Sequence, residues 1–222
     1  MFSRNRSFVR ALCAVSLLLA LAAPAQYRER QPASARDQWQ QPARVLDALG
    51  VEAGSSVADV GAGPGYFTVR MAELVGNAGR VYAVDISEQA VRDLRQRVEK
   101  EGLKQVEVIH STADDPRLPA EALDAALVVN AYHEFKQHDA MLAGIKSALK
   151  PGGRLGIIDK VGREDRSREA NEQRHELPLR FARADLERNG FADVREQPGF
   201  EPSDPDRSGE KWWFLVARKP LH

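Results

Sequence analysis

Three glycines and an aspartate are spaced as a binding site for a small organic ligand requires. Residues 57–68 read V-A-D-V-G-A-G-P-G-Y-F-T, so Asp59 precedes glycines at positions 61, 63 and 65. Glycine lets the backbone turn sharply and lets a ligand lie close against it. A helix that begins directly after such a turn points its free N–H groups at the ligand. The spacing therefore predicts a ligand cradle at Gly61, Gly63 and Gly65.

The residues around these glycines narrow the class of ligand. A nicotinamide or flavin fingerprint, G-x-G-x-x-G, needs glycine where this chain has Tyr66. A phosphate-binding P-loop needs G-K-S/T after its turn, and no lysine follows here. Asp59 would repel a pyrophosphate but would suit a cationic group. A ligand with a nucleoside at one end and an ammonium at the other fits this arrangement.

A second acid lies where the ribose of a nucleoside is expected. Residues 80–87 read R-V-Y-A-V-D-I-S, and their alternating apolar side chains predict a strand that ends at Asp85. In nucleotide-binding α/β folds, an acid about twenty residues after the glycines binds the ribose hydroxyls. Asp85 is therefore the predicted ribose ligand.

These two segments, D-x-G-x-G-x-G and V-x-A-V-D-I-S, resemble those of class I S-adenosylmethionine-dependent methyltransferases, as does the later turn L-K-P-G-G-R-L. The resemblance covers residues 40–218. It implies S-adenosylmethionine as the cofactor and a small molecule as the methyl acceptor. Asp59 would then serve the methionine ammonium directly or through water, Asp85 the ribose hydroxyls, and Ile86 one face of the adenine.

The resemblance assigns two further positions to the cofactor. The family usually reads the adenine amino group with an Asp-Ala or Asn-Ala pair after the third strand. Thr112 and Ala113 occupy the matching position here, so the usual carboxylate is missing, and Asp114 is its possible substitute. Asn130, which follows the fourth predicted strand, is expected to bond the methionine end of the cofactor.

His133 is the predicted general base, with Tyr132 as a second catalytic candidate. Methyl transfer depends mainly on alignment, and a base is needed only when the acceptor must lose a proton. Histidine titrates near neutral pH, which suits that task. The alternative is that His133 caps or packs the loop. No metal site is predicted, because His133-Glu134 is not followed by His at the H-E-x-x-H spacing and the other histidines show no ligand spacing.

The pattern of apolar residues predicts an α/β fold. It is a single Rossmann-like, doubly wound, mostly parallel sheet with an antiparallel C-terminal strand hairpin, and its ligand lies outside the carboxyl ends of the strands. The charged stretch 162–173 is expected to be a mobile or helical insert. The predicted strands are residues 57–60, 80–85, 106–109, 123–129, 155–159, 191–196 and 211–218, and the predicted helices are residues 43–49, 66–75, 87–100, 136–149 and 174–189.

The first 25 residues have the pattern of a secretory signal peptide. Basic residues between positions 4 and 10 precede the apolar run 11–23, and Ala23-Pro24-Ala25 is a small-residue cleavage site. The run is short for a transmembrane span, so no stable span is expected after cleavage. Residues 26–42 are predicted to be a polar linker or N-terminal flap, and residues 43–222 the catalytic domain. The predicted location is periplasmic or secreted, with an uncleaved N-terminal anchor as the alternative.

Composition excludes several other classes of protein. The 222 residues hold 32 Lys plus Arg and 32 Asp plus Glu. Removal of residues 1–25 takes away three arginines and no acid, which leaves 29 against 32, a net charge of −3. A weakly acidic body is not expected to bind nucleic acid. The single cysteine, Cys13, lies in the leader, so the mature chain has no disulfide, thiol nucleophile or thiolate metal site.

Three functional hypotheses follow from these residues. The leading one is S-adenosylmethionine-dependent methyl transfer to a small molecule. The second is an exported protein that binds a nucleoside ligand without turnover, because the cofactor is made in the cytosol and has no obvious supply outside. The third, a nicotinamide oxidoreductase, is disfavoured by Tyr66.

Overall fold

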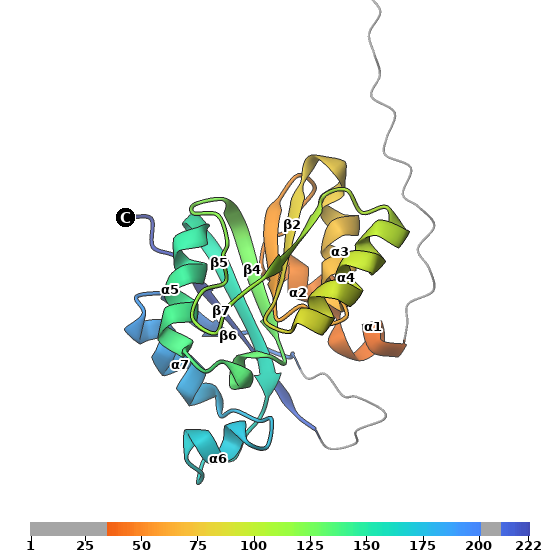
Figure 1. Cartoon of the computed structure of the whole chain (residues 1–222). Coiled ribbons are helices and arrows are strands. Elements are labelled where there is room, and N and C mark those ends of the chain that lie inside the picture. The colour runs from red at the N-terminus through yellow and green to blue at the C-terminus, as the bar shows by residue number, and fades with distance from the viewer. Residues whose placement is uncertain (1–34, 201–209) are drawn as a thin grey trace, which may run out of the picture. The chain divides into compact units, whose positions relative to one another are not determined.

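A sheet of seven strands organises the part of the chain that the computed structural model describes, residues 35–200 and 210–222. Its strand order is β3-β2-β1-β4-β5-β7-β6 (Figure 1). The predicted signal peptide lies outside the described residues. The strands are β1 (Ser56–Val60), β2 (Arg80–Asp85), β3 (Val106–His110), β4 (Leu123–Val129), β5 (Leu149–Lys160), β6 (Ala192–Glu196) and β7 (Trp212–Arg218).

The sheet changes direction of growth between β1 and β4. The chain runs outward from β1 through β2 to β3 and then crosses back to place β4 on the other side of β1, all in parallel. β5 continues in parallel beside β4, whereas β7 is antiparallel to both β5 and β6. These pairings confirm the predicted fold class. Ligands of such sheets bind at the switch in strand order, here above the carboxyl ends of β1 and β4.

Helices cover both faces of the sheet. Helices α2, α3 and α4 pack on one face, and α5 and α7 on the other. No helix among the described residues is both long and apolar enough to cross a membrane. The helices are α1 (Ala35–Gln40), α2 (Pro42–Ala48), α3 (Tyr66–Val75), α4 (Glu88–Glu101), α5 (His138–Ala148), α6 (Arg168–Glu172) and α7 (Leu179–Arg188), with 3₁₀ turns η1 (Gly76–Ala78) and η2 (Tyr132–Glu134).

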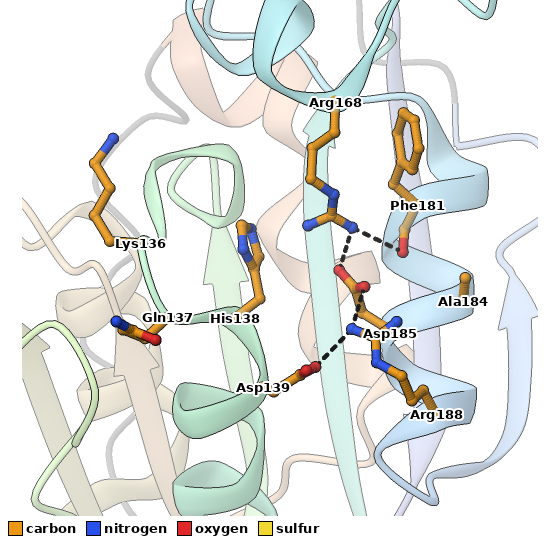
Figure 2. A pocket seen from close by; sticks show the side chains of 9 residues that line it. All are labelled: Lys136, Gln137, His138, Asp139, Arg168, Phe181, Ala184, Asp185 and Arg188. Atoms are coloured by element: carbon orange, nitrogen blue, oxygen red, sulfur yellow. Dashed lines mark hydrogen bonds and ion pairs between the residues drawn. The ribbon is translucent and has the colours of Figure 1, made fainter.

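A buried carboxylate ties together the elements on the α5 and α7 face. Asp185 of α7 is 2% exposed and accepts a hydrogen bond of 2.8 Å from the Tyr132 hydroxyl of η2. Arg168 of α6 donates to the same carboxylate at 2.5 Å, and Arg188 at 2.8 Å (Figure 2). A buried charge is tolerated only when it is paired in this way. Asp185 therefore fixes η2, α6 and α7 with respect to one another.

A groove runs between the start of α5 and α7 (Figure 2). Its charged side chains bind one another: Arg188 bonds Asp139 at 2.6 Å, and Arg168 bonds Asp185. The groove shares no residue with the glycine turn. We assign it no function, because these pairs already satisfy the groups that would recognise a ligand. The lining residues are Lys136, Gln137, His138, Asp139, Arg168, Phe181, Ala184, Asp185 and Arg188.

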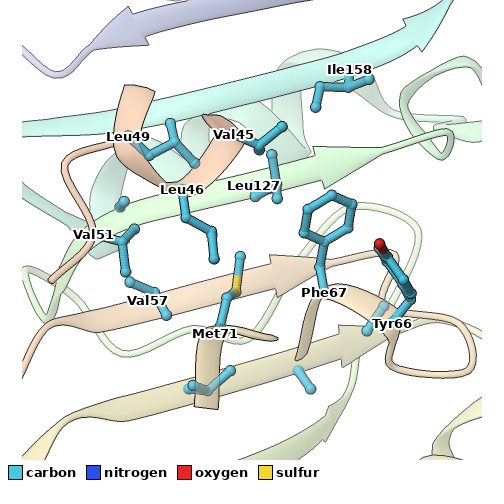
Figure 3. Close-up of a cluster of buried hydrophobic side chains, with 14 of the residues drawn as sticks. Val45, Leu46, Leu49, Val51, Val57, Tyr66, Phe67, Met71, Leu127 and Ile158 are labelled. Atoms are coloured by element: carbon cyan, nitrogen blue, oxygen red, sulfur yellow. The ribbon is translucent and has the colours of Figure 1, made fainter. Parts of the chain in front are cut away.

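The opposite face carries the core that supports the glycine turn (Figure 3). Phe67 and Met71 project from α3 and pack with Leu46 of α2 over Val57 and Leu127 of the central strands. All five side chains are at most 3% exposed. Burying a side chain of this size stabilises the fold by roughly 1.5–3 kcal/mol. Since α3 begins directly after the turn, this packing also fixes where the turn lies.

Helix α1 lies within the segment predicted to be a linker or flap and contacts α3. Asp37 accepts a hydrogen bond from the Tyr66 hydroxyl and binds Arg70 with an Nη2–Oδ1 distance of 2.8 Å. The guanidinium of Arg36 lies 4.0 Å from the centre of the Tyr66 ring. The polar composition of this segment gave no sign of these contacts, which join residues about thirty positions apart.

Two boundaries differ by more than two residues from those predicted. The segment L-K-P-G-G-R, predicted as a turn, is the first part of β5, where Gly152 N–H donates to Lys219 at 3.0 Å and Lys219 N–H donates to Gly153 at 2.9 Å. Helix α7 begins at Leu179 instead of residue 174. Pro178 disfavours helical geometry in the residue before it, and Leu177 N–H instead donates to Lys160 at 3.0 Å.

The Asp185 network predicts a graded loss of stability. Asp185→Ala should lower the free energy of unfolding by about 3–5 kcal/mol, because it leaves buried donors without an acceptor. Tyr132→Phe removes one hydrogen bond and should cost about 1 kcal/mol. Asp165→Ala breaks an exposed pair with Arg163 and should leave the free energy of unfolding nearly unchanged, because solvent screens such a pair. Urea unfolding measures all three, and equal losses in the three variants would contradict the prediction.

Candidate active site

The glycine turn is bound to the carboxyl end of β2. Gly61 and Ala62 donate their N–H groups to the Val84 carbonyl at 2.8 and 3.0 Å, and Gly63 N–H donates to Asp85 Oδ2 at 2.8 Å. The three glycines have φ values of 76°, 51° and 78°, a region in which side chains are strained. The turn thus needs glycine at each position for its backbone alone.

The surroundings of the three glycines differ. A Cβ added at Gly61 would lie 2.4 Å from Ala131 Cβ, and one at Gly65 would lie 2.4 Å from Leu94 Cδ1. At Gly63, no atom of the described residues lies within 4 Å of such a Cβ. All three glycines were predicted to bind the ligand. The structure places Gly63 against open space, whereas Gly61 and Gly65 allow the turn to pack on its neighbours.

Asp85 and Ile86 place an acid and an apolar side chain next to each other beside this open space. Asp85 Oδ2 holds Gly63 N–H and its Oδ1 accepts Ser87 N–H, each at 2.8 Å. These bonds orient the carboxylate, and each oxygen keeps a lone pair for a further donor such as a hydroxyl. The Ile86 side chain is 56% exposed, which is unusual for a large apolar residue. An exposed apolar surface beside an oriented acid suits a nucleoside.

Asp59 lies beneath the turn, bound to α3. It is 3% exposed and accepts a hydrogen bond of 2.6 Å from the Thr68 hydroxyl. Burial raises the pKa of Asp59 to about 6, although the hydrogen bonds from Thr68 oppose this shift. Its predicted contact with a ligand ammonium stays a prediction, and the structure shows a second role, which is to connect β1 to α3.

The residues predicted to read the base and the far end of the ligand lie after β3 and β4. Thr112 and Ala113 are half-buried, and the Thr112 hydroxyl donates to Asp114 Oδ1 at 2.6 Å. The backbone N–H of Ser111 donates to the Asp85 carbonyl at 3.0 Å, so this turn lies beside the end of β2. Asn130 is exposed and left-handed, with a φ of 53°, at the end of β4. All of these residues occupy the carboxyl edge of the sheet.

The structure does not support the predicted catalytic role of Tyr132. Its side chain is fully buried in the core on the α5 and α7 face, and its hydroxyl donates to Asp185. Burial raises the pKa of the Tyr132 hydroxyl above its usual range, and the charge of Asp185 raises it further. Tyr132 is therefore a core residue that holds η2 in place.

The side chain of His133 is also buried, but only one of its two ring nitrogens, Nδ1, is bound to Asp159. Its backbone N–H donates to Asp159 Oδ2 at 3.0 Å, and its Nδ1 lies 2.8 Å from Asp159 Oδ1. Because a carboxylate only accepts, Nδ1 carries the proton and Nε2 keeps a lone pair. Burial lowers the pKa of His133, but the bond to Asp159 and its charge outweigh that effect, so the pKa is raised. Nε2 faces His175 Nδ1 at 3.3 Å and Glu134 Oε1 at 3.6 Å.

Two residues of this arrangement were missed in the sequence. Asp159 is fully buried at the end of β5, and only its place at a strand end hinted at a role. His175 lies 42 residues after His133, in the segment between α6 and α7, and no motif connects the two. The pairing of β4 with β5 brings Asp159 to the site. The chain after α6 brings His175 there.

Comparison with known proteins identifies the domain. Residues 57–153 match a family described as methyltransferase domain. The matched range begins in β1 and ends in β5, so it contains the glycine turn, Asp85 and the loop from Asn130 to Glu134. Asp159 and His175 lie outside it.

Two curated relatives and one crystal structure illustrate what this chain is similar to. The demethylmenaquinone methyltransferase of Listeria welshimeri is 30% identical over 115 residues, which are 52% of this chain and 49% of the relative. The ubiquinone/menaquinone biosynthesis C-methyltransferase of Escherichia coli is 29% identical over 116 residues, which are 52% and 46% of the two chains. This chain thus spans about half the length of the curated relatives it matches.

The similar crystal structure is that of a SAM-dependent methyltransferase from Aquifex aeolicus. It is 27% identical, has a TM-score of 0.69, and the match covers 83% of this chain and 93% of that one. Together with the domain match, it supports the predicted class of enzyme and the predicted cofactor, S-adenosylmethionine.

The raised pKa of Asp59 predicts a loss of stability as the pH rises. The folded protein binds this proton more tightly than the unfolded chain, whose pKa is near the ordinary 3.8, so stability falls between about pH 4 and about pH 6. The difference between these two pKa values corresponds to roughly 3 kcal/mol in the free energy of unfolding. Asp59→Asn removes the titrating group and should abolish this part of the pH dependence.

Urea unfolding of both proteins at pH 4.5 and at pH 7.5 measures the difference. The asparagine variant should gain more stability relative to the parent at pH 7.5 than at pH 4.5. Identical pH dependences would show that Asp59 titrates normally in the folded protein.

Proposed function

We propose that this chain is a class I S-adenosylmethionine-dependent methyltransferase and that it methylates a small hydroxylated ring compound of the quinol type. The observation that supports the cofactor half is the open space at Gly63 beside the oriented Asp85 carboxylate and the exposed Ile86. The quinol class is supported by the names of the curated relatives, demethylmenaquinone and ubiquinone/menaquinone methyltransferases.

Each residue of the proposed cofactor site has a separate task. Gly63 lets the methionine chain lie against the backbone, and Asp85 accepts the two ribose hydroxyls. Ile86 covers one face of the adenine, and Thr112 with Ala113 borders its amino group. Asn130 bonds the methionine end from the other side of the switch point. Asp59 holds the turn on α3 and supplies a negative charge beneath the ammonium.

When bound, S-adenosylmethionine supplies a methyl carbon already activated by its sulfonium, so the protein chiefly has to align the acceptor. The loop from Asn130 to Glu134 is the proposed acceptor side, because Ala131 borders the glycine turn at Gly61. A quinol hydroxyl must lose its proton for its oxygen or ring carbon to attack the methyl group. Ionisable groups at His133 and Glu134 lie in this loop.

Export is part of this proposal. The leader predicted over residues 1–25 would carry the enzyme out of the cytosol, and fractionation of cells that express the full chain tests this location. Recovery of the protein in the cytosolic fraction with its leader intact would contradict export without affecting the assignment of methyl transfer.

A matched pair of glycine substitutions tests the cofactor site. Gly63→Ala and Gly102→Ala both place a side chain at positive φ, 51° and 66°, and neither meets an atom of the described residues within 4 Å. The backbone strain is therefore similar, about 1 kcal/mol. Only the change at Gly63 should weaken binding of S-adenosylmethionine, by at least about tenfold, since a methyl group fills space that the ligand needs. Calorimetry that shows equal affinity for both variants would overturn the assignment of the cradle.

The full activity is tested with radiolabelled S-adenosylmethionine and a panel of reduced naphthoquinols and benzoquinols that lack a ring methyl or methoxy group. Transfer of label to a quinol should be seen, and Asp85→Ala should weaken cofactor affinity by about ten- to a hundredfold, because hydrogen bonds to a charged group are lost. Cofactor binding without transfer to any quinol or other small hydroxyl compound would favour the exported nucleoside-binding protein instead.

A further inference from the structure

Three side chains from two distant parts of the chain turn one ligand atom each toward the same point. His133 Nε2 lies 3.3 Å from His175 Nδ1, and each of these nitrogens lies 3.6 Å from Glu134 Oε1. The same three atoms make all three distances, so they form a nearly equilateral triangle. We infer that His133, Glu134 and His175 bind a divalent transition-metal ion of the zinc type.

The size of the triangle matches the edge of a tetrahedral zinc site. With Zn–N and Zn–O distances of about 2.0–2.1 Å, neighbouring ligand atoms of a tetrahedron lie about 3.3–3.4 Å apart. An octahedral Mg²⁺ site with ligands at 2.0–2.1 Å would need them about 2.9 Å apart. The observed 3.3 and 3.6 Å therefore favour four-coordinate geometry with only a small inward movement.

The chemistry of the ligands also favours zinc. Two imidazoles and one carboxylate suit Zn²⁺ and its neighbours in the first transition series, whereas Mg²⁺ and Ca²⁺ prefer oxygen ligands alone. Two histidines and one glutamate form a known set of catalytic zinc ligands, which leaves the fourth position for water or a substrate. Glu134 and His175 have side chains 60% and 67% exposed, so that fourth position is reached from solvent.

Asp159 prepares His133 as a ligand. Its carboxylate accepts the Nδ1 proton at 2.8 Å and is itself fully buried. This bond fixes the ring orientation and directs the Nε2 lone pair toward Glu134 and His175. A carboxylate that supports a metal-binding imidazole in this way raises its basicity and typically contributes ten- to a hundredfold in affinity.

The backbone around His175 holds its ring opposite His133. Leu177 N–H donates to Lys160 at 3.0 Å, and the Trp213 indole donates to the Leu177 carbonyl at 2.7 Å. The first bond attaches the segment to the end of β5, one residue after Asp159, and the second attaches it to β7. His175 itself is left-handed, with a φ of 57°, a conformation uncommon outside glycine and asparagine. The fold therefore brings this side chain to the site despite its exposure.

A metal ion here would change the role of His133. An Nε2 that binds a metal cannot also accept a proton, so the site replaces the general base predicted from the sequence. If the proposed quinol methylation holds, the ion would take the acceptor oxygen as its fourth ligand and stabilise it after its proton leaves to solvent. This last step rests on the proposed function, whereas the binding of the ion does not.

Metal titration of the full chain tests the site without cofactor or acceptor. Protein stripped with a chelator should bind one Zn²⁺ and gain thermal stability, and Mg²⁺ at the same concentration should have no effect. His175→Ala and Glu134→Gln change exposed side chains and should fold normally, yet lower zinc affinity by at least about tenfold. His222→Ala removes an exposed histidine elsewhere and should bind zinc as the parent does.

Zinc affinity that is the same in the parent, His175→Ala and Glu134→Gln would overturn the site, as would the absence of zinc binding. In that case the 3.3 Å contact is a hydrogen bond from His175 to His133. Calorimetry with S-adenosylmethionine on the metal-free protein separates the two proposals. Normal cofactor binding without zinc binding rejects the metal site alone, and the reverse result rejects the methyltransferase assignment alone.

Discussion

The hydrogen bond from Gly63 N–H to the Asp85 carboxylate is the contact on which the cofactor side of this protein depends. It joins the loop after β1 to the end of the neighbouring strand. The second oxygen of Asp85 accepts the backbone N–H of Ser87, the residue after Ile86. One carboxylate thereby sets the position of the open turn, the exposed Ile86 and the start of α4. Because both partners lie at strand ends, the parallel pairing of β1 with β2 brings them into register.

Asp159 binds a backbone N–H of a neighbouring loop in the same way, on the other side of the point where the strand order reverses. It ends β5 as Asp85 ends β2, and it accepts the backbone N–H of His133 in the loop after the neighbouring strand β4. It also accepts the N–H of the residue that follows it, Lys160. The two outer carboxylates thus hold the two inner loops of the sheet. One loop presents a backbone to the cofactor, and the other presents an imidazole nitrogen.

The sequence predicted more of the glycine-turn side of the site than of the His133 side. The first two strands, the helix between them and the carboxylate of Asp85 lie within thirty residues, so local spacing was enough to predict them. The division of labour among the glycines was not predicted, because it depends on Ala131 and Leu94, which only the fold brings near. Tyr132 was misassigned for a similar reason. Its hydroxyl binds Asp185, 53 residues away, and no local pattern reveals such a pair.

The matched domain covers only one of the two sides of the site. The matched methyltransferase domain ends at residue 153, before Asp159 and the segment that carries His175. The residues of the proposed cofactor site lie inside that range, so the likeness to other methyltransferases bears directly on that proposal. The His175 side chain comes from the segment between β5 and α7, whose attachments include the backbone of Leu177 and the Asp185 network. A change in that segment would alter the proposed acceptor side and leave the glycine turn intact, and such changes let one cofactor fold serve different acceptors.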